Sequence, residues 1–446
     1  MLKPPDVIVI GAGAAGLTAA ARLARAGLSV TMLEARDRIG GRMFTKRDPI
    51  SQIPIEFGAE FIHGLPAEIW EPLQSRNINI TEVDGDQWCF NNGRLCSCDL
   101  FSQVDEILKA MDARSPDESF LSFLNRSFPD DRARHEARRK ALSYITGFNA
   151  ADPDKVGVHW LVQGMRAEEK IDGDRAFRSK NGYADLLDIL LQDLAKSGVR
   201  IESETIVDSV KWTPGRAEIT AHGANESCRF ATRKLLVTVP LGVLQASDGQ
   251  DGAVCFTPAL PRTKVEALQK LRMGKIIRVT LRFRQRFWET LSAPTESSKT
   301  LDGMSFLFSD DDWYPTWWTM MPEKLPIITG WAPFHCAERL SGKSHSFVVD
   351  HALQTLSNLL DVRSDKLAQL LDDSYFHDWQ NDPFSRGAYS YGGVDADGAQ
   401  AVLATPVENT LFFAGEATDI SGHNGTVHGA IASGQRAADE IFHGFR

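Results

Sequence analysis

Three glycines near the N-terminus have the spacing that brings a backbone turn against a phosphate group. They lie in the run Gly11-Ala12-Gly13-Ala14-Ala15-Gly16, which follows the β-branched segment Val7 to Ile10. The first glycine allows a tight turn, the second allows close approach of a pyrophosphate, and the third allows a helix to pack on the strand. Amides at the start of that helix would donate hydrogen bonds to the anion. The run therefore predicts a dinucleotide-binding strand, turn and helix.

Glu34 is the carboxylate that such a turn is usually paired with. It ends a second β-rich run, Leu28 to Leu33, about twenty residues beyond the turn, where an acidic side chain accepts hydrogen bonds from ribose hydroxyls. A carboxylate there repels a 2′-phosphate, so the residue favours NAD or FAD over NADP.

A glycine pair flanked by arginines follows this carboxylate. The run Glu34-Ala35-Arg36-Asp37-Arg38-Ile39-Gly40-Gly41-Arg42 suits a second anionic contact along an extended pyrophosphate. The alternative interpretation is a basic surface turn.

The elements that must position these residues are spread along the chain. Residues 7–34 predict one βαβ unit, and residues 67–150 predict a helical, polar region with helices at 67–74, 101–111, 119–123 and 132–145. A helix at 183–195 and strands at 199–201, 206–212, 217–221, 234–239 and 276–283 follow. A helix at 350–360, a buried strand at 411–414 and a helix at 427–442 complete the pattern. If both ends of the chain hold one ligand, the cofactor domain is discontinuous in sequence.

The composition is that of a globular protein in which acidic residues outnumber basic ones. The 446 residues carry a formal charge of −10, which argues against nucleic acid as a partner. No stretch reaches about 18 consecutive apolar residues, and Pro4-Pro5 with the following glycines does not fit a secretion signal, so we expect a cytoplasmic protein away from membranes.

Neither the cysteines nor the histidines have the spacing of a metal site. Only Cys96 and Cys98 form a close pair, without a second pair or nearby histidines, and we expect reduced thiols. His351, His377 and His443 are interpreted as surface or capping residues. No metal is predicted.

Several runs together resemble the flavin-containing amine oxidase family, which includes monoamine oxidases, polyamine oxidases and lysine-specific demethylases. They extend over nearly the whole chain: Glu34 to Arg42, Gly58-Ala59-Glu60-Phe61-Ile62-His63-Gly64, Thr238 to Leu244, Phe413-Ala414-Gly415-Glu416-Ala417-Thr418, and Gly425-Thr426-Val427-His428-Gly429-Ala430. The resemblance implies a soluble member of the family with an α/β fold. It would have a Rossmann-like FAD-binding domain and an α+β substrate-binding domain. We expect the FAD-binding domain at residues 1–75, 180–270 and 384–446, and the substrate-binding domain at 76–179 and 271–383.

The resemblance also implies the residues that would hold FAD. Besides the glycine turn, Glu34 and the arginine run, these are Gly58, Ala59, Glu60, Phe61, Val207, Trp379, Gly415, Glu416, Gly425, Thr426, Val427 and Ala430. Val207 would hold the adenine through its backbone. Ala388 occupies the place where monoamine oxidases have a flavin-linked cysteine, so FAD is expected to be non-covalent.

The same comparison places Tyr389 and Thr426 on opposite walls in front of the flavin, an arrangement similar to that of demethylases and some polyamine oxidases. A tyrosine face can guide an amine and exclude water. The family's lysine, water-bridged to flavin N5, is replaced by Arg278, with Lys275 three residues earlier, and the resemblance makes both cations candidate catalytic residues. Arginine keeps its charge, so reoxidation by oxygen could differ from that of relatives.

Glu60 and His63 resemble the pocket edge of polyamine oxidases. We expect Glu60 to hold the second ammonium of a diamine, against the alternative of a solvated Glu60 and a His63 that caps a turn.

These inferences predict FAD-dependent oxidation of an amine by hydride transfer to flavin N5, imine hydrolysis to an aldehyde, and reoxidation by dioxygen to hydrogen peroxide. The substrate would be a primary or secondary amine, with di- and polyamines included, and a homodimer is a candidate assembly. A flavin dehydrogenase or desaturase and a flavin-stabilised interaction protein remain alternatives.

Overall fold

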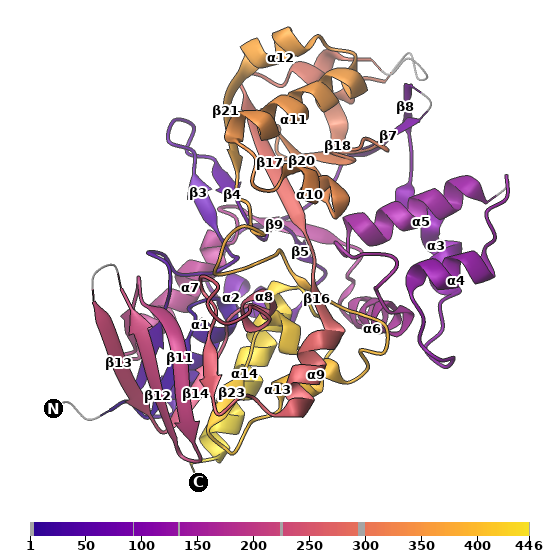
Figure 1. The fold of residues 1–446 in the computed structure, drawn as a ribbon. Helices are drawn as coiled ribbons and strands as arrows, with labels where there is room; N and C mark the ends of the chain where they lie inside the picture. The colour runs from indigo at the N-terminus through magenta and orange to yellow at the C-terminus, as the bar shows by residue number, and fades with distance from the viewer. Residues whose placement is uncertain (1–3, 92, 133, 224–225, 293–298, 446) are drawn as a thin grey trace.

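A five-stranded parallel sheet forms the centre of the part that carries the glycine turn. The computed structural model describes residues 4–91, 93–132, 134–223, 226–292 and 299–445. The strands lie in the order β10 (Arg200–Glu202), β2 (Val30–Leu33), β1 (Val7–Ile10), β14 (Lys234–Val237) and β23 (Leu411–Phe413). Segments from the start, middle and end of the chain therefore build one sheet, at the lower left of Figure 1.

Both faces of this sheet are covered, as its uninterrupted apolar strands require. One face, with Val7 and Val9, packs on α1 (Ala14–Arg25), α7 (Ala184–Ala195) and α14 (Val427–His443). The other, with Ile8 and Ile10, packs on a sheet in the order β13 (Ser227–Thr232), β12 (Arg216–His222), β11 (Ile206–Thr213) and β15 (Cys255–Thr257).

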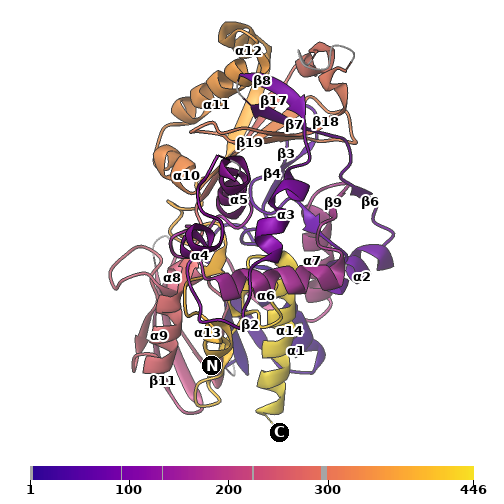
Figure 2. The ribbon, with the colours of Figure 1, turned by 90° about the vertical axis from the view of Figure 1, so that its right-hand side faces the viewer.

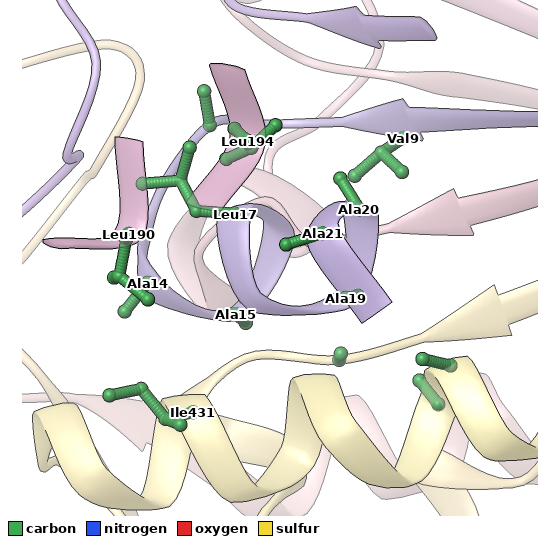
Figure 3. Close-up of a cluster of buried hydrophobic side chains, with 14 of the residues drawn as sticks. Val9, Ala14, Ala15, Leu17, Ala19, Ala20, Ala21, Leu190, Leu194 and Ile431 are labelled. Carbon is green, nitrogen blue, oxygen red and sulfur yellow. The ribbon is translucent and has the colours of Figure 1, made fainter. Parts of the chain in front are cut away.

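Small residues let α1 and α14 approach closely, as the alanines of α1 facing Ile431 in Figure 3 show. A Cβ on Gly434 would lie 2.4 Å from the carbonyl oxygen of Ala15. This contact ties the final helix to the helix that begins at the glycine turn.

A second, seven-stranded sheet lies at the top of Figure 1. Its order is β21 (Leu371–Phe376), β17 (Ile276–Phe283), β20 (Ile327–Pro333), β19 (Thr316–Thr319), β18 (Met304–Phe308), β7 (Asp86–Asn91) and β8 (Arg94–Ser97). Its buried side chains pack with those of α10 (His335–Leu340), α11 (His345–Leu360) and α12 (Ser364–Leu370).

A third core joins four helices between the two sheets, as Figure 2 shows. They are α3 (Leu100–Lys109), α4 (Phe120–Ser127), α5 (His135–Gly147) and α6 (Val158–Glu168). The remaining elements are β3 (Thr45–Arg47), β4 (Pro54–Glu56), β5 (Ile62–His63), α2 (Ala67–Ser75), β6 (Ile80–Glu82), η1 (Glu169–Ile171), β9 (Ala176–Ser179), α8 (Leu241–Leu244), α9 (Arg262–Lys270), β16 (Leu271–Met273), η2 (Phe287–Thr290), η3 (Leu301–Gly303), β22 (Ser390–Gly392), α13 (Ala399–Ala404) and η4 (Glu416–Thr418).

The α/β fold class is confirmed, but the helical interpretation of residues 67–150 is wrong in part. The strands β6, β7 and β8 lie inside it. The alternating apolar residues around Trp88 and the Asn-Gly pair at 92–93 are a hairpin signal that the polar surroundings obscured.

This hairpin also corrects the expectation of reduced thiols. Cys89 and Cys98 form a disulfide with their Cα atoms 5.7 Å apart. The pairing of β7 with β8 brings them together, whereas the sequence drew attention to Cys96, which is free.

In the part of the chain that the structure describes, no helix is long and apolar enough to span a bilayer. The same residues contain no group of three His, Cys, Asp or Glu side chains arranged to hold a metal ion.

Candidate active site

One cavity of about 1150 Å³ extends from the glycine turn to the helices between the two sheets. It is lined by most of the residues predicted from the sequence: Gly11, Gly13, Ala14, Ala15, Glu34, Ala35, Arg36, Gly40, Gly41, Arg42, Gly58, Ala59, Glu60, Phe61, His63, Val207, Arg278, Trp379, Tyr389, Gly415, Glu416, Gly425, Thr426, Val427 and Ala430. Segments far apart in the sequence therefore meet around one space.

The glycine turn has the geometry of a phosphate cradle. Gly11 adopts φ 100°, and a Cβ on Gly16 would lie 2.1 Å from the carbonyl oxygen of Gly11, so both positions need glycine for the turn itself. Gly13 differs, because its φ is −84° and a Cβ there would meet no protein atom within 4 Å. Since Gly13 lines the cavity, the space beside it is free for a ligand.

Glu34 is held rigidly at the end of β2. Its side chain is 5% exposed and accepts hydrogen bonds from the amides of Ala12 (2.8 Å) and Arg36 (3.0 Å). The carboxylate thus joins the glycine turn to the arginine run and presents its remaining acceptor capacity to the cavity.

The arginines of that run contact protein groups rather than standing free. Arg36 donates to Asp382 (2.8 Å) and to the Ser385 hydroxyl (3.1 Å). Arg42 donates to the Ala388 carbonyl (2.8 Å) and to Glu416 (2.9 Å). These hydrogen bonds connect the 382–388 segment to the arginine run. Gly40 and Gly41, between the two arginines, line the cavity.

Glu416 is the centre of the C-terminal part of the site. Besides Arg42, it accepts from the Ser390 hydroxyl (2.5 Å) and the Gly425 amide (3.0 Å). Thr426 caps α14, because its hydroxyl accepts from the Gly429 amide (3.0 Å) and donates to the His423 carbonyl (2.7 Å). Thr426 therefore fixes the start of α14, where Val427 and Ala430 line the cavity and free amides of the first turn could donate to an electron-rich ligand.

Trp379 is fixed as a wall of the cavity. Its indole N–H donates to the Phe57 carbonyl (2.7 Å), and a Cβ on Gly58 would lie 3.3 Å from its ring. The ring and the Gly58 backbone thus form one continuous surface.

Glu60 lies in a buried network, which contradicts its predicted role as the free partner of a substrate ammonium. Its side chain is 9% exposed and accepts from Arg178 (2.8 Å), Arg278 (3.2 Å) and the Trp318 indole (3.1 Å). Two guanidinium groups therefore already compensate this carboxylate. Arg278 also donates to the Gly58 carbonyl (3.0 Å), and its Nη2 is buried with no partner among the described residues.

His63 faces the cavity beside Phe148, with ring centroids 5.4 Å apart. Burial lowers the pKa of His63 to about 4, so its ring is neutral at physiological pH. Among the described residues, His63 forms no hydrogen bond that would cap a turn, which does not fit the alternative interpretation of this residue.

Tyr389 is fixed by a hydrogen bond from its hydroxyl to the Phe148 carbonyl (2.8 Å). Burial raises the pKa of this hydroxyl, so it stays protonated. The ring of Phe148 stacks on that of Tyr144, with centroids 5.4 Å apart and planes at 8°. An aromatic wall thus runs from Tyr389 into the helical region.

Lys275 does not reach the site. It precedes β17 and forms a 2.6 Å ion pair with Glu338, where both side chains are exposed. The catalytic role predicted for Lys275 is therefore wrong, and Arg278 is the cation of this segment that lines the cavity.

The sequence did not predict several residues in and around the cavity. Arg178, on β9, binds Glu60 from outside the cavity lining, whereas Trp318, Tyr144, Phe148 and Glu168 line it directly. No local motif marks these residues, because helices and strands distant in sequence bring them to the cavity.

The comparisons agree with this architecture. Residues 100–442 match the family model of flavin containing amine oxidoreductases, and residues 9–75 match that of an NAD(P)-binding Rossmann-like domain. The chain is similar in structure to putrescine oxidase bound to putrescine, with a TM-score of 0.80 at 21% identity, covering 98% of this chain and 99% of that one.

Two similar sequences are plant proteins. The chain is 28% identical to lysine-specific histone demethylase 1 homolog 3 of Arabidopsis thaliana, across 99% of this chain but only 30% of that protein's length. It is 27% identical to polyamine oxidase 4 of Oryza sativa subsp. japonica, across 98% of this chain and 88% of that protein.

The cavity fits the cofactor that this family description names. The free space beside Gly13, the carboxylate of Glu34 and the amides at the start of α14 suit the pyrophosphate, ribose and flavin ends of FAD. With the family model matching most of the chain, this protein belongs to the flavin-containing amine oxidoreductases and is an FAD-dependent amine oxidoreductase.

Proposed function

We propose that the protein is an oxidase that converts a primary or secondary amine to an imine, which water hydrolyses to an aldehyde. The observation that carries this proposal is the single cavity that joins the FAD-binding residues to Tyr389 and the aromatic wall. FAD, when bound, accepts the hydride from the carbon next to nitrogen, and dioxygen takes up the electrons as hydrogen peroxide.

The chain's own residues position the amine and control water. Tyr389 and Phe148 offer aromatic faces that orient the alkyl group and exclude water. The substrate nitrogen must be uncharged at the moment of reaction, since an ammonium has no lone pair to stabilise the developing cation. His63, neutral at physiological pH, adds no positive charge that would oppose a cationic substrate.

The pH dependence of flavin reduction tests this account. With a monoamine, the rate of anaerobic bleaching should rise between about pH 6 and pH 9 as more of the amine loses its proton. A His63→Gln variant should show the same profile, because a group whose pKa lies near 4 has already lost its proton over this range. Stopped-flow absorbance measures both. A flat profile in the wild type, or one that flattens only in the variant, would contradict the account.

An FAD dehydrogenase is the second candidate, favoured by Arg278 at the place of the family's lysine. Burial lowers the pKa of the Arg278 guanidinium, and the charge of Glu60 opposes this shift. Because arginine starts from a far higher pKa than lysine, it differs from the family's lysine at this place. Oxygen electrode and peroxide assays separate the two, because an oxidase consumes one dioxygen for each amine, whereas a dehydrogenase needs another acceptor. An interaction protein would instead hold a flavin that no amine bleaches.

We also propose that FAD is bound without a covalent link, since Ala388 offers no thiol, and that residues 1–75, 180–270 and 384–446 form its domain, with 76–179 and 271–383 forming the substrate-binding domain. The two large sheets support this division, because each draws nearly all its strands from one set of ranges. A cytoplasmic location, a homodimer, and the absence of nucleic acid as a partner are part of the same proposal. Denaturation and filtration would release intact FAD if the link is non-covalent.

A further inference from the structure

The hairpin of β7 and β8 carries three cysteines and forms part of the cavity wall. Gln87, Cys89 and Asn91 alternate along β7, and all three line the cavity, as residues on one face of a strand should. Cys89 is bonded to Cys98, which follows β8 directly. The disulfide therefore begins in the wall of the cavity itself.

The same bond fixes the start of a helix that lines the cavity. Only Asp99 separates Cys98 from the first residue of α3. Val104 and Leu108 of this helix line the cavity. In Figure 1 the hairpin lies at the edge of the upper sheet, and α3 lies in the helical region below it. The bond from Cys89 to Cys98 thus ties the part of the wall formed by β7 to the part formed by α3.

The structure around the disulfide does not depend on the bond alone. The Cys98 amide donates to the Gln87 carbonyl (3.1 Å), and this hydrogen bond can persist when the sulfurs part. Val104 and Leu108 pack in the core that joins the four helices, which holds α3 from its other side. Reduction should therefore leave the hairpin and α3 folded and remove only the covalent constraint between them.

The two cysteines of the bond face different surroundings. Cys89 is buried but borders the cavity, into which the proposed reaction would release peroxide. Cys98 is partly exposed and does not line the cavity, so a thiol or a peroxide can approach it from solvent. Exposure of this kind separates a responsive disulfide from one that is sealed in a core.

We propose that Cys89 and Cys98 are a redox modification site, which switches between disulfide and dithiol and thereby sets how tightly the cavity holds its substrate. The inference rests on the proposed amine oxidation, because that reaction supplies the peroxide, and it concerns the regulation of the same site. In the cytoplasm, where we place the protein, cellular thiols keep most cysteines reduced, so a disulfide there forms when an oxidant acts.

The chemistry balances with hydrogen peroxide as the oxidant. The Cys98 thiolate attacks one peroxide oxygen and breaks the O–O bond, which gives a sulfenic acid and hydroxide. The proton that the thiol had lost converts the hydroxide to water. The Cys89 thiol then attacks the sulfenic sulfur, which forms the S–S bond and releases a second water. A cellular dithiol reverses the change by thiol–disulfide exchange and is itself oxidised to a disulfide.

Cys96 offers a matched control on the same hairpin. It lies opposite Cys89 in the register of the two strands, and its thiol donates to the Cys89 carbonyl (3.5 Å), but it is free and does not line the cavity. Because its thiol could replace that of Cys98 as the partner of Cys89, the variant Cys98→Ser is made in a Cys96→Ser background. Cys96→Ser alone is the control and should respond to redox conditions as the wild type does.

The first test follows the thiols and needs no turnover. The FAD-loaded Cys96→Ser protein is incubated with an excess of reduced glutathione, then with added hydrogen peroxide, and is alkylated and mapped by mass spectrometry after each step. Glutathione should expose Cys89 and Cys98 to alkylation, and peroxide should protect both again. Amide deuterium exchange at the start of α3 should be faster in the reduced form. A bond that stays closed in glutathione, or that peroxide does not restore, would overturn the proposal.

The second test compares amine oxidation by the two forms. Reduction of the Cys96→Ser protein should raise KM about 3- to 10-fold, because the wall of the cavity is no longer held in place. The limiting rate of flavin bleaching should stay within about twofold, since the bond acts on binding rather than on the reacting atoms. The double variant should have the high KM before and after peroxide treatment. An equal KM in the oxidised and reduced forms would show a bond that is merely structural, and it would overturn the proposal.

The two tests together separate this inference from the proposed function. If no amine bleaches the flavin, but added peroxide still closes the bond and slows exchange at the start of α3, the redox site stands and the oxidase function fails. If amines are oxidised but the bond does not respond to glutathione and peroxide, the oxidase function stands and the redox site is wrong.

Discussion

Glu60→Gln is expected to lower the free energy of unfolding by about 3–5 kcal/mol, the usual result of removing one partner from a buried ion-pair network. The substitution removes the carboxylate that forms ion pairs with both Arg178 and Arg278. Arg178 would keep no ion-pair partner among the described residues, and Arg278 would keep only the charge of nearby Glu56, whose pKa is raised by burial. Arg278 Nη2 already lacks a hydrogen-bond partner among the described residues. Urea unfolding at a fixed excess of FAD measures the change.

Glu168→Gln provides the comparison for Glu60→Gln. Because burial disfavours the ionised form of Glu168, and no described residue donates a hydrogen bond to it, its removal should leave stability unchanged or raise it at pH 8. The sign follows from its raised pKa: the ionised group costs stability above about pH 7, and this cost disappears as the pH falls toward 4.5. A Glu60→Gln variant as stable as the wild type would show that Glu60 does not compensate the two guanidinium groups.

Gly13→Ala is expected to yield a folded protein that is purified without flavin, with affinity for FAD reduced by about 100-fold or more. The fold has no need of glycine at this position, because the backbone is extended and an added Cβ would meet no protein atom within 4 Å. The methyl group would instead occupy the place where the pyrophosphate approaches the start of α1. The ratio of flavin to protein absorbance and a titration of the apoprotein with FAD measure the effect.

Gly147→Ala is the matched control for this variant. Gly147 also lines the cavity and has no atom within 4 Å of an added Cβ, but it ends α5, on the side of Tyr144. It should retain full flavin content. Normal FAD binding by Gly13→Ala would show that the dinucleotide does not lie against this turn.

The parts of the site that were predictable from sequence depend on local backbone geometry. The run from Gly11 to Gly16 encodes a turn whose positive φ and close approach only glycine permits, and Glu34 lies at the end of the adjacent strand. Strand, turn and helix are neighbours in sequence, so their contacts could be read from spacing. The same holds for the buried strand Leu411–Phe413 and the helix that follows it.

The hydrogen-bond partners of Glu60 could not be predicted from spacing in the sequence. Arg178 and Trp318 lie 118 and 258 residues away, and they reach Glu60 from β9 and β19. Without them, Glu60 resembled a free carboxylate at a pocket edge. The structure shows the opposite, and it reveals an uncompensated carboxylate at Glu168, which has no motif around it.

Strand register explains why Arg278 reaches the cavity and Lys275 does not. The strand β17 begins at Ile276, and Arg278 pairs with Trp331 within the sheet, which turns the arginine toward Glu60. Lys275 lies before the strand and is free to reach Glu338 on α10. The resemblance made both cations candidates for the site, whereas the sheet turns only Arg278 toward the cavity.

An anaerobic titration of the flavin-loaded protein tests the central claim most directly. Monoamines, diamines, polyamines and amino acids would be added in turn while the visible flavin absorbance is followed, and air would then be admitted. The account predicts that amines bleach the flavin, and that air restores the colour with release of hydrogen peroxide. A flavin that no amine bleaches, in a protein that binds FAD fully, would contradict it.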